Sequence, residues 1–156
     1  MAKAKPVPEG YSTATPYLTV RGAAAALDFY RRVFDAQELM RMPAPDGKIG
    51  HAEFQIGNSR IMIADEYPSM GARSPQSLGG SPVSIYLYVA DVDDRVSRAV
   101  AAGAKVIRPV EDKFYGDRSA SLEDPFGHTW HVATHVEDVA PDELRRRAEN
   151  FMKQAG

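Results

Sequence analysis

The sequence of 156 residues contains no cysteine, which excludes disulfide bonds, a thiolate nucleophile and a cysteine-ligated zinc site. It also contains no apolar run near the ~20 residues that a membrane-spanning helix needs. The start, MAKAKPVPEG, has no apolar stretch typical of a signal peptide, so we expect a cytoplasmic protein. Neither sign of charge dominates, because the net charge is −2, and this argues against nucleic acid or a membrane as partner.

The residues that are present are those of an ordinary globular chain. Hydrophobic residues make up 44% and charged residues 26% of the sequence. A chain of this length buries roughly 70% of its unfolded surface when it folds, so it needs no disulfide or metal for stability. We therefore expect one globular domain, or two small modules fused around one core.

Two stretches of the chain predict the same order of elements: strand, helix, strand, strand, strand. The first stretch consists of TATPYLTV, GAAAALDFYRRVF, AQELMRM, IGHAEFQI and RIMIAD. The second consists of VSIYLYVA, VDDRVSRAVAAG, AKVIRPV, YGDRSASLE and HTWHVATH. Alternating apolar residues predict the strands, and apolar residues three and four apart predict the helices. The repeated order indicates an internal duplication.

The pattern predicts how the chain is divided. We expect an N-terminal tail over 1–13, a first module over 14–65, a linker or lid over 66–81, a second module over 82–136 and a C-terminal helix over 137–156. The apolar residues of that last helix, Leu144, Ala148, Phe151 and Met152, form a narrow stripe. So narrow a stripe does not stabilise an isolated helix, so the helix must pack on the body or on a second chain.

The duplication, together with DPFGHTW before the final strand, resembles the vicinal oxygen chelate superfamily, which includes glyoxalases, bleomycin resistance proteins and extradiol dioxygenases. FYRRVF, HAEFQIGNSRIMIADE and FYGDRSASLEDPFGHTWHVATH are most similar to its PhnB-like branch. The resemblance implies an α+β fold of two tandem βαβββ modules. Their sheets would form a cup-shaped, incomplete barrel with the helices outside. It also implies a homodimer and a ligand or metal inside the cup.

Strand alternation predicts which side chains face the cup, because successive residues of a strand point to opposite faces. Ala52 and Phe54 suit the helix side, which leaves His51 and Glu53 for the cup. The same argument selects polar or aromatic residues on the other strands: Tyr17, Ser84, Tyr86, Tyr88, His131 and His135. A face of this kind predicts a cavity for a small organic molecule.

A metal-binding member of the superfamily places one ligand on each of four strands, and the resemblance puts Thr15, Glu53, Ser84 and His131 at these positions. Glu53 and His131 are suitable ligands for a divalent transition metal, whereas neutral hydroxyl groups bind such ions weakly. We therefore expect no tightly bound metal and no other cofactor. If a divalent metal does bind, Glu53 and His131 would hold it.

Two functions stay open. In an enzyme of the isomerase or lyase kind, Glu53 would be the general base, its pKa raised by aromatic surroundings, and His131 would polarise or protonate the substrate. The alternative is a protein that sequesters a drug or metabolite without chemistry, as bleomycin resistance proteins do. Ligand contacts are expected from His51, Tyr17, Tyr86, Tyr88, Arg118, Trp130 and His135.

Several of the candidate residues also have ordinary structural explanations. Arg118 could hold a carboxylate or phosphate, but a pair with Asp117 or Glu123 is the commoner arrangement. Trp130 occupies a packing position, where a core role is more frequent than stacking on a ligand. The Glu53–His131 pair has such an explanation too, since the two groups could simply bond each other.

Overall fold

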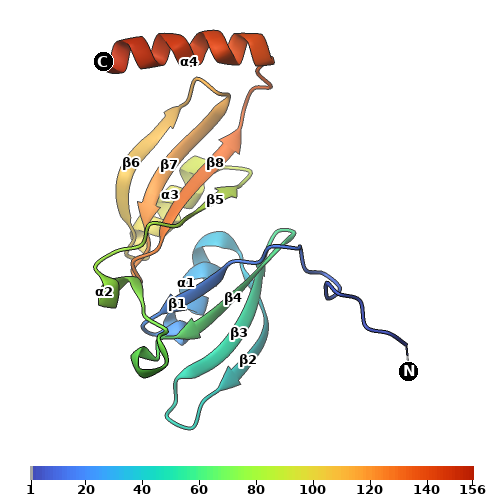
Figure 1. Ribbon diagram of the computed structural model, residues 1–156. Helices are drawn as coiled ribbons and strands as arrows, with labels where there is room; N and C mark the ends of the chain where they lie inside the picture. The colour runs from blue at the N-terminus through green and yellow to red at the C-terminus, as the bar shows by residue number, and fades with distance from the viewer. Residues whose placement is uncertain (1) are drawn as a thin grey trace. The chain divides into compact units, whose positions relative to one another are not determined.

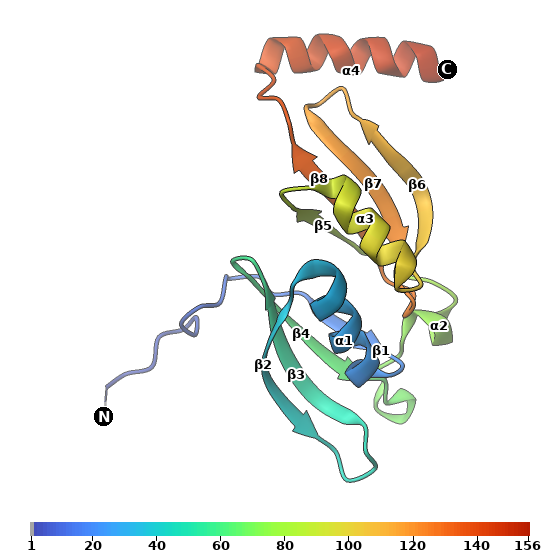
Figure 2. The same ribbon diagram turned by 180° about the vertical axis from the view of Figure 1, so that it is seen from behind.

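Two four-stranded sheets form the fold in the computed structural model, which describes residues 2–156 (Figure 1). The chain divides into two units, the first ending at Ser81 and the second beginning at Pro82. Each unit contributes one complete sheet, and each sheet carries one helix of its own unit on one face (Figure 2).

The first unit contains strands β1 to β4 and helix α1, with the bounds Tyr17–Val20, Ala23–Phe34 (α1), Gln37–Pro43, Ile49–Ile56 and Ser59–Asp65. The strand order is β1-β4-β3-β2, with β1 parallel to β4 and the other pairs antiparallel. Helix α1 buries Tyr30 and Val33 against the sheet, where Phe54 stacks on Tyr30 with ring centroids 5.3 Å apart. These apolar side chains form the core of the first unit.

Asp65, at the end of β4, holds three backbone segments together. Helix α1 begins after Gly22, which has a left-handed conformation and provides no side-chain cap. Asp65 Oδ1 instead accepts hydrogen bonds from the N–H groups of Gly22, at 2.8 Å, and Ala23, at 2.9 Å. Its Oδ2 accepts from the N–H of Ile49 at 2.8 Å. One buried carboxylate therefore caps α1 and fixes the start of β3.

The second unit repeats this arrangement with β5 (Ser84–Tyr88), α3 (Val92–Ala101), β6 (Lys105–Asp112), β7 (Asp117–Glu123) and β8 (Thr129–His135). Its strand order is β5-β8-β7-β6, again with the first pair parallel. Asp91 caps α3 locally, because its side chain accepts from the N–H of Asp94 at 3.1 Å. Trp130 is fully buried in this unit, and its Nε1–H donates to Asp124 Oδ2 at 2.9 Å.

The segment after β4 contains a 3-10 turn, η1 (Pro68–Met70), and a short helix, α2 (Pro75–Leu78). Glu66 fastens it to the first unit. Its carboxylate accepts from Arg21 Nε at 2.5 Å, from the N–H of Ser74 at 3.0 Å and from Ser77 Oγ at 2.6 Å. The hydrogen bonds from Ser77, Ser74 and Arg21 lower the pKa of Glu66 to about 2.

The last helix, α4 (Pro141–Ala155), has no buried residue. Within the second unit, Arg147 donates to both carboxylate oxygens of Glu137, at 2.9 and 2.8 Å, and to the carbonyl of Phe114 at 3.1 Å. The rings of Phe151 and Phe114 lie 5.2 Å apart. Leu144 and Ala148 of the predicted apolar stripe are half-buried, whereas Phe151 is 53% and Met152 70% exposed in the chain described.

The predicted fold class is confirmed: an α+β fold with two four-stranded sheets, helices outside and no closed barrel. Both modules have the predicted order of strand, helix, strand, strand, strand. No helix within residues 2–156 is both long and apolar enough to cross a membrane.

Candidate functional site

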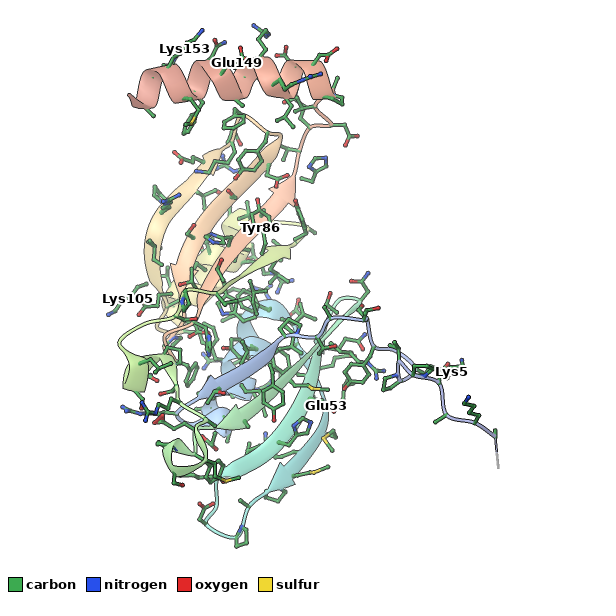
Figure 3. The ribbon with its side chains drawn as sticks, viewed as in Figure 1. Lys5, Glu53, Tyr86, Lys105, Glu149 and Lys153 are labelled. Carbon is green, nitrogen blue, oxygen red and sulfur yellow. The ribbon has the colours of Figure 1, made fainter. Side chains whose placement is uncertain are left out.

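The face of the first sheet that lies away from α1 carries the predicted acid and one histidine. His51 and Glu53 on β3 are half-buried, with 24% and 21% of their side chains exposed, whereas Ala52 and Phe54 between and beside them are buried. Figure 3 labels Glu53 on this strand. We call this surface, with Tyr17 of β1 and the methionines described below, the Glu53 face.

A chain of hydrogen bonds crosses the Glu53 face. The hydroxyl of Tyr17 lies 2.7 Å from His51 Nδ1, and His51 Nε2 lies 3.1 Å from Glu53 Oε1. Because the imidazole bonds on both sides, it connects a phenol to a carboxylate. The three predicted residues of this unit are therefore brought together by the structure.

Tyr11, from the segment predicted as a tail, completes the arrangement. Its hydroxyl donates a hydrogen bond to Glu53 Oε2, and the Arg60 guanidinium lies over its ring at 4.9 Å from the centroid. Hydrogen bonds from Tyr11 and His51 lower the pKa of Glu53 below its ordinary value. The expectation that surroundings would raise this pKa is therefore wrong, because donated hydrogen bonds outweigh the desolvation of the carboxylate.

Methionines surround the carboxylate on the same face. Met40 on β2 and Met62 on β4 lie directly opposite Glu53 in the sheet, and Met42 lies opposite His51. Side chains of directly opposed residues in neighbouring strands point to the same side. Glu53 therefore stands between two thioether side chains, which pack well against irregular or aromatic partners.

The corresponding face of the second sheet carries the remaining predicted residues. His131 on β8 lies opposite Tyr86 on β5, which Figure 3 labels, and their rings are 5.9 Å apart. The imidazole contacts two hydroxyl groups, with Nδ1 2.8 Å from Ser121 Oγ and Nε2 3.0 Å from Ser84 Oγ. His131 is thus held in a fixed orientation by serine side chains on both sides.

Asp117, at the start of β7, is the centre of a second polar cluster. Its carboxylate accepts from Tyr86 at 2.7 Å and from Tyr88 at 3.1 Å, and lies 2.8 Å from His135 Nδ1. His135 Nε2 lies 2.8 Å from Asp138 Oδ1 on its other side. From the sequence, Asp117 was expected only as a partner of Arg118. Alternation along β7 nevertheless places Asp117 on the same face of the sheet as Ser121.

The charges in the Asp117 cluster support one another. Burial favours the neutral form of Asp117, but hydrogen bonds from His135, Tyr86 and Tyr88 outweigh it and lower the carboxyl pKa. The same carboxylate, with Asp138, raises the pKa of His135. Burial and then the Asp117 contact raise the pKa of Tyr86 and of Tyr88, so both stay neutral donors.

Arg118 and Trp130 lie on the helix side of the second sheet, away from this cluster. The guanidinium of Arg118 pairs with Asp93 of α3, at 2.9 and 3.0 Å, and with Asp112 at 3.2 Å. Trp130 is fully buried. The structure therefore does not bring either residue to the polar face, because their strand positions have the opposite parity.

The residues at the four metal positions do not fit a metal site. Thr15 precedes β1, and its hydroxyl lies 3.5 Å from the carbonyl of Ser12. His131 uses both of its imidazole nitrogens in hydrogen bonds, Nε2 with Ser84 and Nδ1 with Ser121. Within each unit, over the described residues 2–81 and 82–156, no three His, Asp or Glu side chains are grouped so that they could hold an ion. Glu53 belongs to the first unit and His131 to the second. That they share one cavity therefore stays a prediction.

Comparisons with known proteins agree with this architecture. The model of the Glyoxalase/Bleomycin resistance protein/Dioxygenase superfamily matches residues 12–132. The uncharacterized protein Rv0887c of Mycobacterium tuberculosis is 47% identical over 134 residues, which cover 84% of this chain and 79% of that protein. The crystal structure of TioX from Micromonospora is 31% identical with a TM-score of 0.62, covering 80% of this chain and 99% of TioX.

A more distant structure shows the fold alone. The fosfomycin resistance protein FosX of Listeria monocytogenes, in complex with Mn(II) and dihydroxypropylphosphonic acid, is 20% identical with a TM-score of 0.62. The match covers 86% of this chain and 96% of FosX.

Proposed function

This chain belongs to the Glyoxalase/Bleomycin resistance protein/Dioxygenase superfamily, and from that premise we propose that it binds a small organic molecule on the polar faces of its sheets. The observation that carries the proposal is the Glu53 face, where Tyr17, His51 and Glu53 are joined by hydrogen bonds. Such a face combines apolar area with a few oriented polar groups, as ligand sites do.

Glu53 is better suited to accepting hydrogen bonds than to removing protons from carbon. Its lowered pKa makes it a weak base but keeps it charged at neutral pH. A charged acceptor forms stronger hydrogen bonds with a ligand donor than a neutral one does. We therefore propose Glu53 and His51 as ligand-binding residues of the first unit, and His131, Tyr86, Tyr88 and His135 as those of the second.

A second candidate function is a proton-transfer isomerase or lyase. The hydrogen-bonded chain from Glu53 through His51 to Tyr17 favours it, because an imidazole bonded on both sides can pass a proton along. In that reaction Glu53 would take the proton from the substrate, and His131 would donate to a substrate oxygen.

We further propose that the protein is a member of the PhnB-like branch, that it is cytoplasmic and that it forms a homodimer. Motifs such as FYRRVF and DPFGHTW support the branch. The exposed apolar area of Phe151 and Met152 on α4 supports association with a second copy. Because the four metal positions do not fit a metal, no step of the proposed function uses one.

A thermal-shift screen of small organic molecules, run with and without divalent metals, tests the proposal. A ligand at a hundred times its Kd stabilises the folded protein by about 2.7 kcal/mol, which is easily measured. Glu53→Gln is the test variant, and Glu149→Gln is the matched control, since Glu149 is an exposed carboxylate on α4.

The result expected for a binding protein is that Glu53→Gln weakens the affinity and Glu149→Gln does not, while neither wild type nor the control turns over the ligand. Unchanged affinity with abolished turnover would establish the enzyme instead. A screen without any ligand that stabilises wild type would refute both functions.

A further inference from the structure

The segment 8–11, which we call the N-terminal strap, folds back over the Glu53 face. The N–H of Tyr11 donates to the carbonyl of Pro8 at 3.1 Å, which closes a turn. Arg60 Nη1 donates to the carbonyl of Glu9 at 3.2 Å and fastens the turn to β4. Gly10 has φ of 83° and passes so close to the Arg60 guanidinium that a β-carbon would collide with it. Only glycine fits at this position without strain.

The strap delivers a phenol to the site. The Tyr11 hydroxyl donates to the Glu53 carboxylate, and the Arg60 guanidinium lies over the face of the ring. Burial and the contact with Glu53 raise the pKa of Tyr11, so the phenol stays neutral and remains a donor. The hydroxyl and the ring of Tyr11 therefore each have a specific partner from the first sheet, Glu53 and Arg60.

The surroundings of the carboxylate suit an aromatic ring more than a second charge. Met40 and Met62 stand on either side of Glu53 in the sheet. Thioether sulfur atoms contact aromatic rings favourably, by ~0.3–1.5 kcal/mol each. Since Tyr11 approaches from outside the sheets, its ring is held by contacts that a free molecule of the same chemistry could also make.

We propose that the Glu53 face binds a neutral hydroxyarene, a phenol, which displaces the side chain of Tyr11. This inference rests on the proposed small-molecule-binding function and names its ligand class. The phenol hydroxyl donates to Glu53 and its ring lies under Arg60, as the Tyr11 side chain does. An arene without the hydroxyl leaves Glu53 Oε2 without its donor, although Oε1 keeps its contact with His51. An aromatic carboxylate is repelled by the negative charge of Glu53.

The strap competes with the free ligand. A tethered group acts at an effective concentration on the order of millimolar, so a free phenol must displace Tyr11 before it binds. Releasing the strap should therefore increase the affinity for a phenol by about tenfold or more. The competition also predicts that a bound phenol frees residues 8–11 from β4.

The test uses p-cresol, the side chain of tyrosine as a free molecule, in isothermal titration calorimetry with the full chain. Tyr11→Ala removes the competing phenol. Gly10→Ala releases the N-terminal strap from β4 but retains the Tyr11 side chain. Both should bind p-cresol about tenfold or more tightly than wild type. Val7→Ala, an exposed position just before the turn, is the matched control and should bind as wild type does. Adding Glu53→Gln to Tyr11→Ala should abolish the gain.

The outcomes separate this inference from the proposed function. Toluene or p-toluate binding Tyr11→Ala as tightly as p-cresol would overturn the phenol assignment. Unchanged p-cresol affinity in both strap variants would also overturn it, provided that circular dichroism shows each variant to be folded. If the thermal-shift screen still yields another ligand that needs Glu53, the proposed function stands without the phenol. If neither experiment yields a ligand, both fail.

Discussion

Replacing Asp117 with asparagine tests whether one carboxylate organises the polar face of the second sheet. The substitution keeps the shape of the side chain but removes its charge. Its oxygen can still accept from Tyr86 and Tyr88, which lie 2.7 and 3.1 Å from one carboxylate oxygen. Its amide must then face His135 Nδ1, which lies 2.8 Å from the other oxygen. That contact is tolerated only while the imidazole is neutral.

The expected loss in the free energy of unfolding follows from the hydrogen bonds of Asp117 that the substitution changes. Hydrogen bonds to a charged group contribute about 1.5–3 kcal/mol each, against about 1 kcal/mol between neutral groups. The tyrosines are 42% and 62% exposed, so water replaces part of what they lose. We therefore expect Asp117→Asn to lower the free energy of unfolding of the second unit by about 2 kcal/mol at neutral pH. Asp117→Ala leaves both tyrosines and His135 without their acceptor and should cost more.

The pH dependence has a defined sign. The pKa of His135 is raised above 6.5, so its contribution is fully present below pH 6.5 and disappears as the pH rises through the folded pKa. The pKa of Asp117 is lowered below 3.8, so its contribution is present above pH 3.8 and disappears on further acidification. The difference between wild type and Asp117→Asn should therefore be largest between these two values.

Trp130 provides the assay, because it is the only tryptophan of the chain and is fully buried in the second unit. Its fluorescence during urea unfolding reports on that unit, and an NMR titration of His135 should show its pKa falling in the variant. Asp112→Asn is the control, since its carboxylate is 74% exposed and should change stability by less than about 0.5 kcal/mol. Equal urea midpoints and an unchanged His135 titration in Asp117→Asn would refute the reasoning.

Two further predictions concern the segment after β4 that Glu66 holds, and the assembly. Glu66→Gln should be less stable than wild type at neutral pH, and the difference should close as the pH falls from 4.5 to about 2, where wild-type Glu66 takes up its proton. Circular dichroism during acid titration measures this, with exposed Glu149→Gln as control; a difference independent of pH would contradict it. Light scattering should give twice 17.1 kDa for a homodimer, and truncation after Val139 should weaken association if α4 lies at the interface. A mass of 17.1 kDa would show a monomer.

The parts of the site that were predictable from the sequence depend on strand alternation. Ala52 and Phe54 are buried, and His51 and Glu53 lie on the other face, as a period of two requires. The same argument predicted that His131 and Tyr86 lie on the face of the second sheet away from its packing residues, and the two are cross-strand neighbours there. Alternation is a local property of the extended backbone, so it can be determined without knowing the rest of the fold.

The contacts that determine the chemistry of the site were not predictable in this way. Tyr11 lies 42 residues before Glu53, in a segment without apolar periodicity, and its hydrogen bond reverses the expected direction of the Glu53 pKa shift. Arg118 pairs with Asp93, 25 residues away on α3, instead of with a neighbour in the sequence. Such pairs depend on how helices and strands pack, which periodicity does not specify.

The two capping arrangements give the repeated modules different folding requirements. Asp91 caps α3 from the adjacent position, so the first turn of that helix can form early, from local sequence alone. The first turn of α1 obtains its acceptor from Asp65, 42 residues further along the chain. Its N–H groups stay uncapped until β4 has been added to the sheet. Closing so long a loop costs chain entropy before the hydrogen bonds form. The completion of α1 is therefore coupled to the long-range contacts of the first sheet, whereas that of α3 is not.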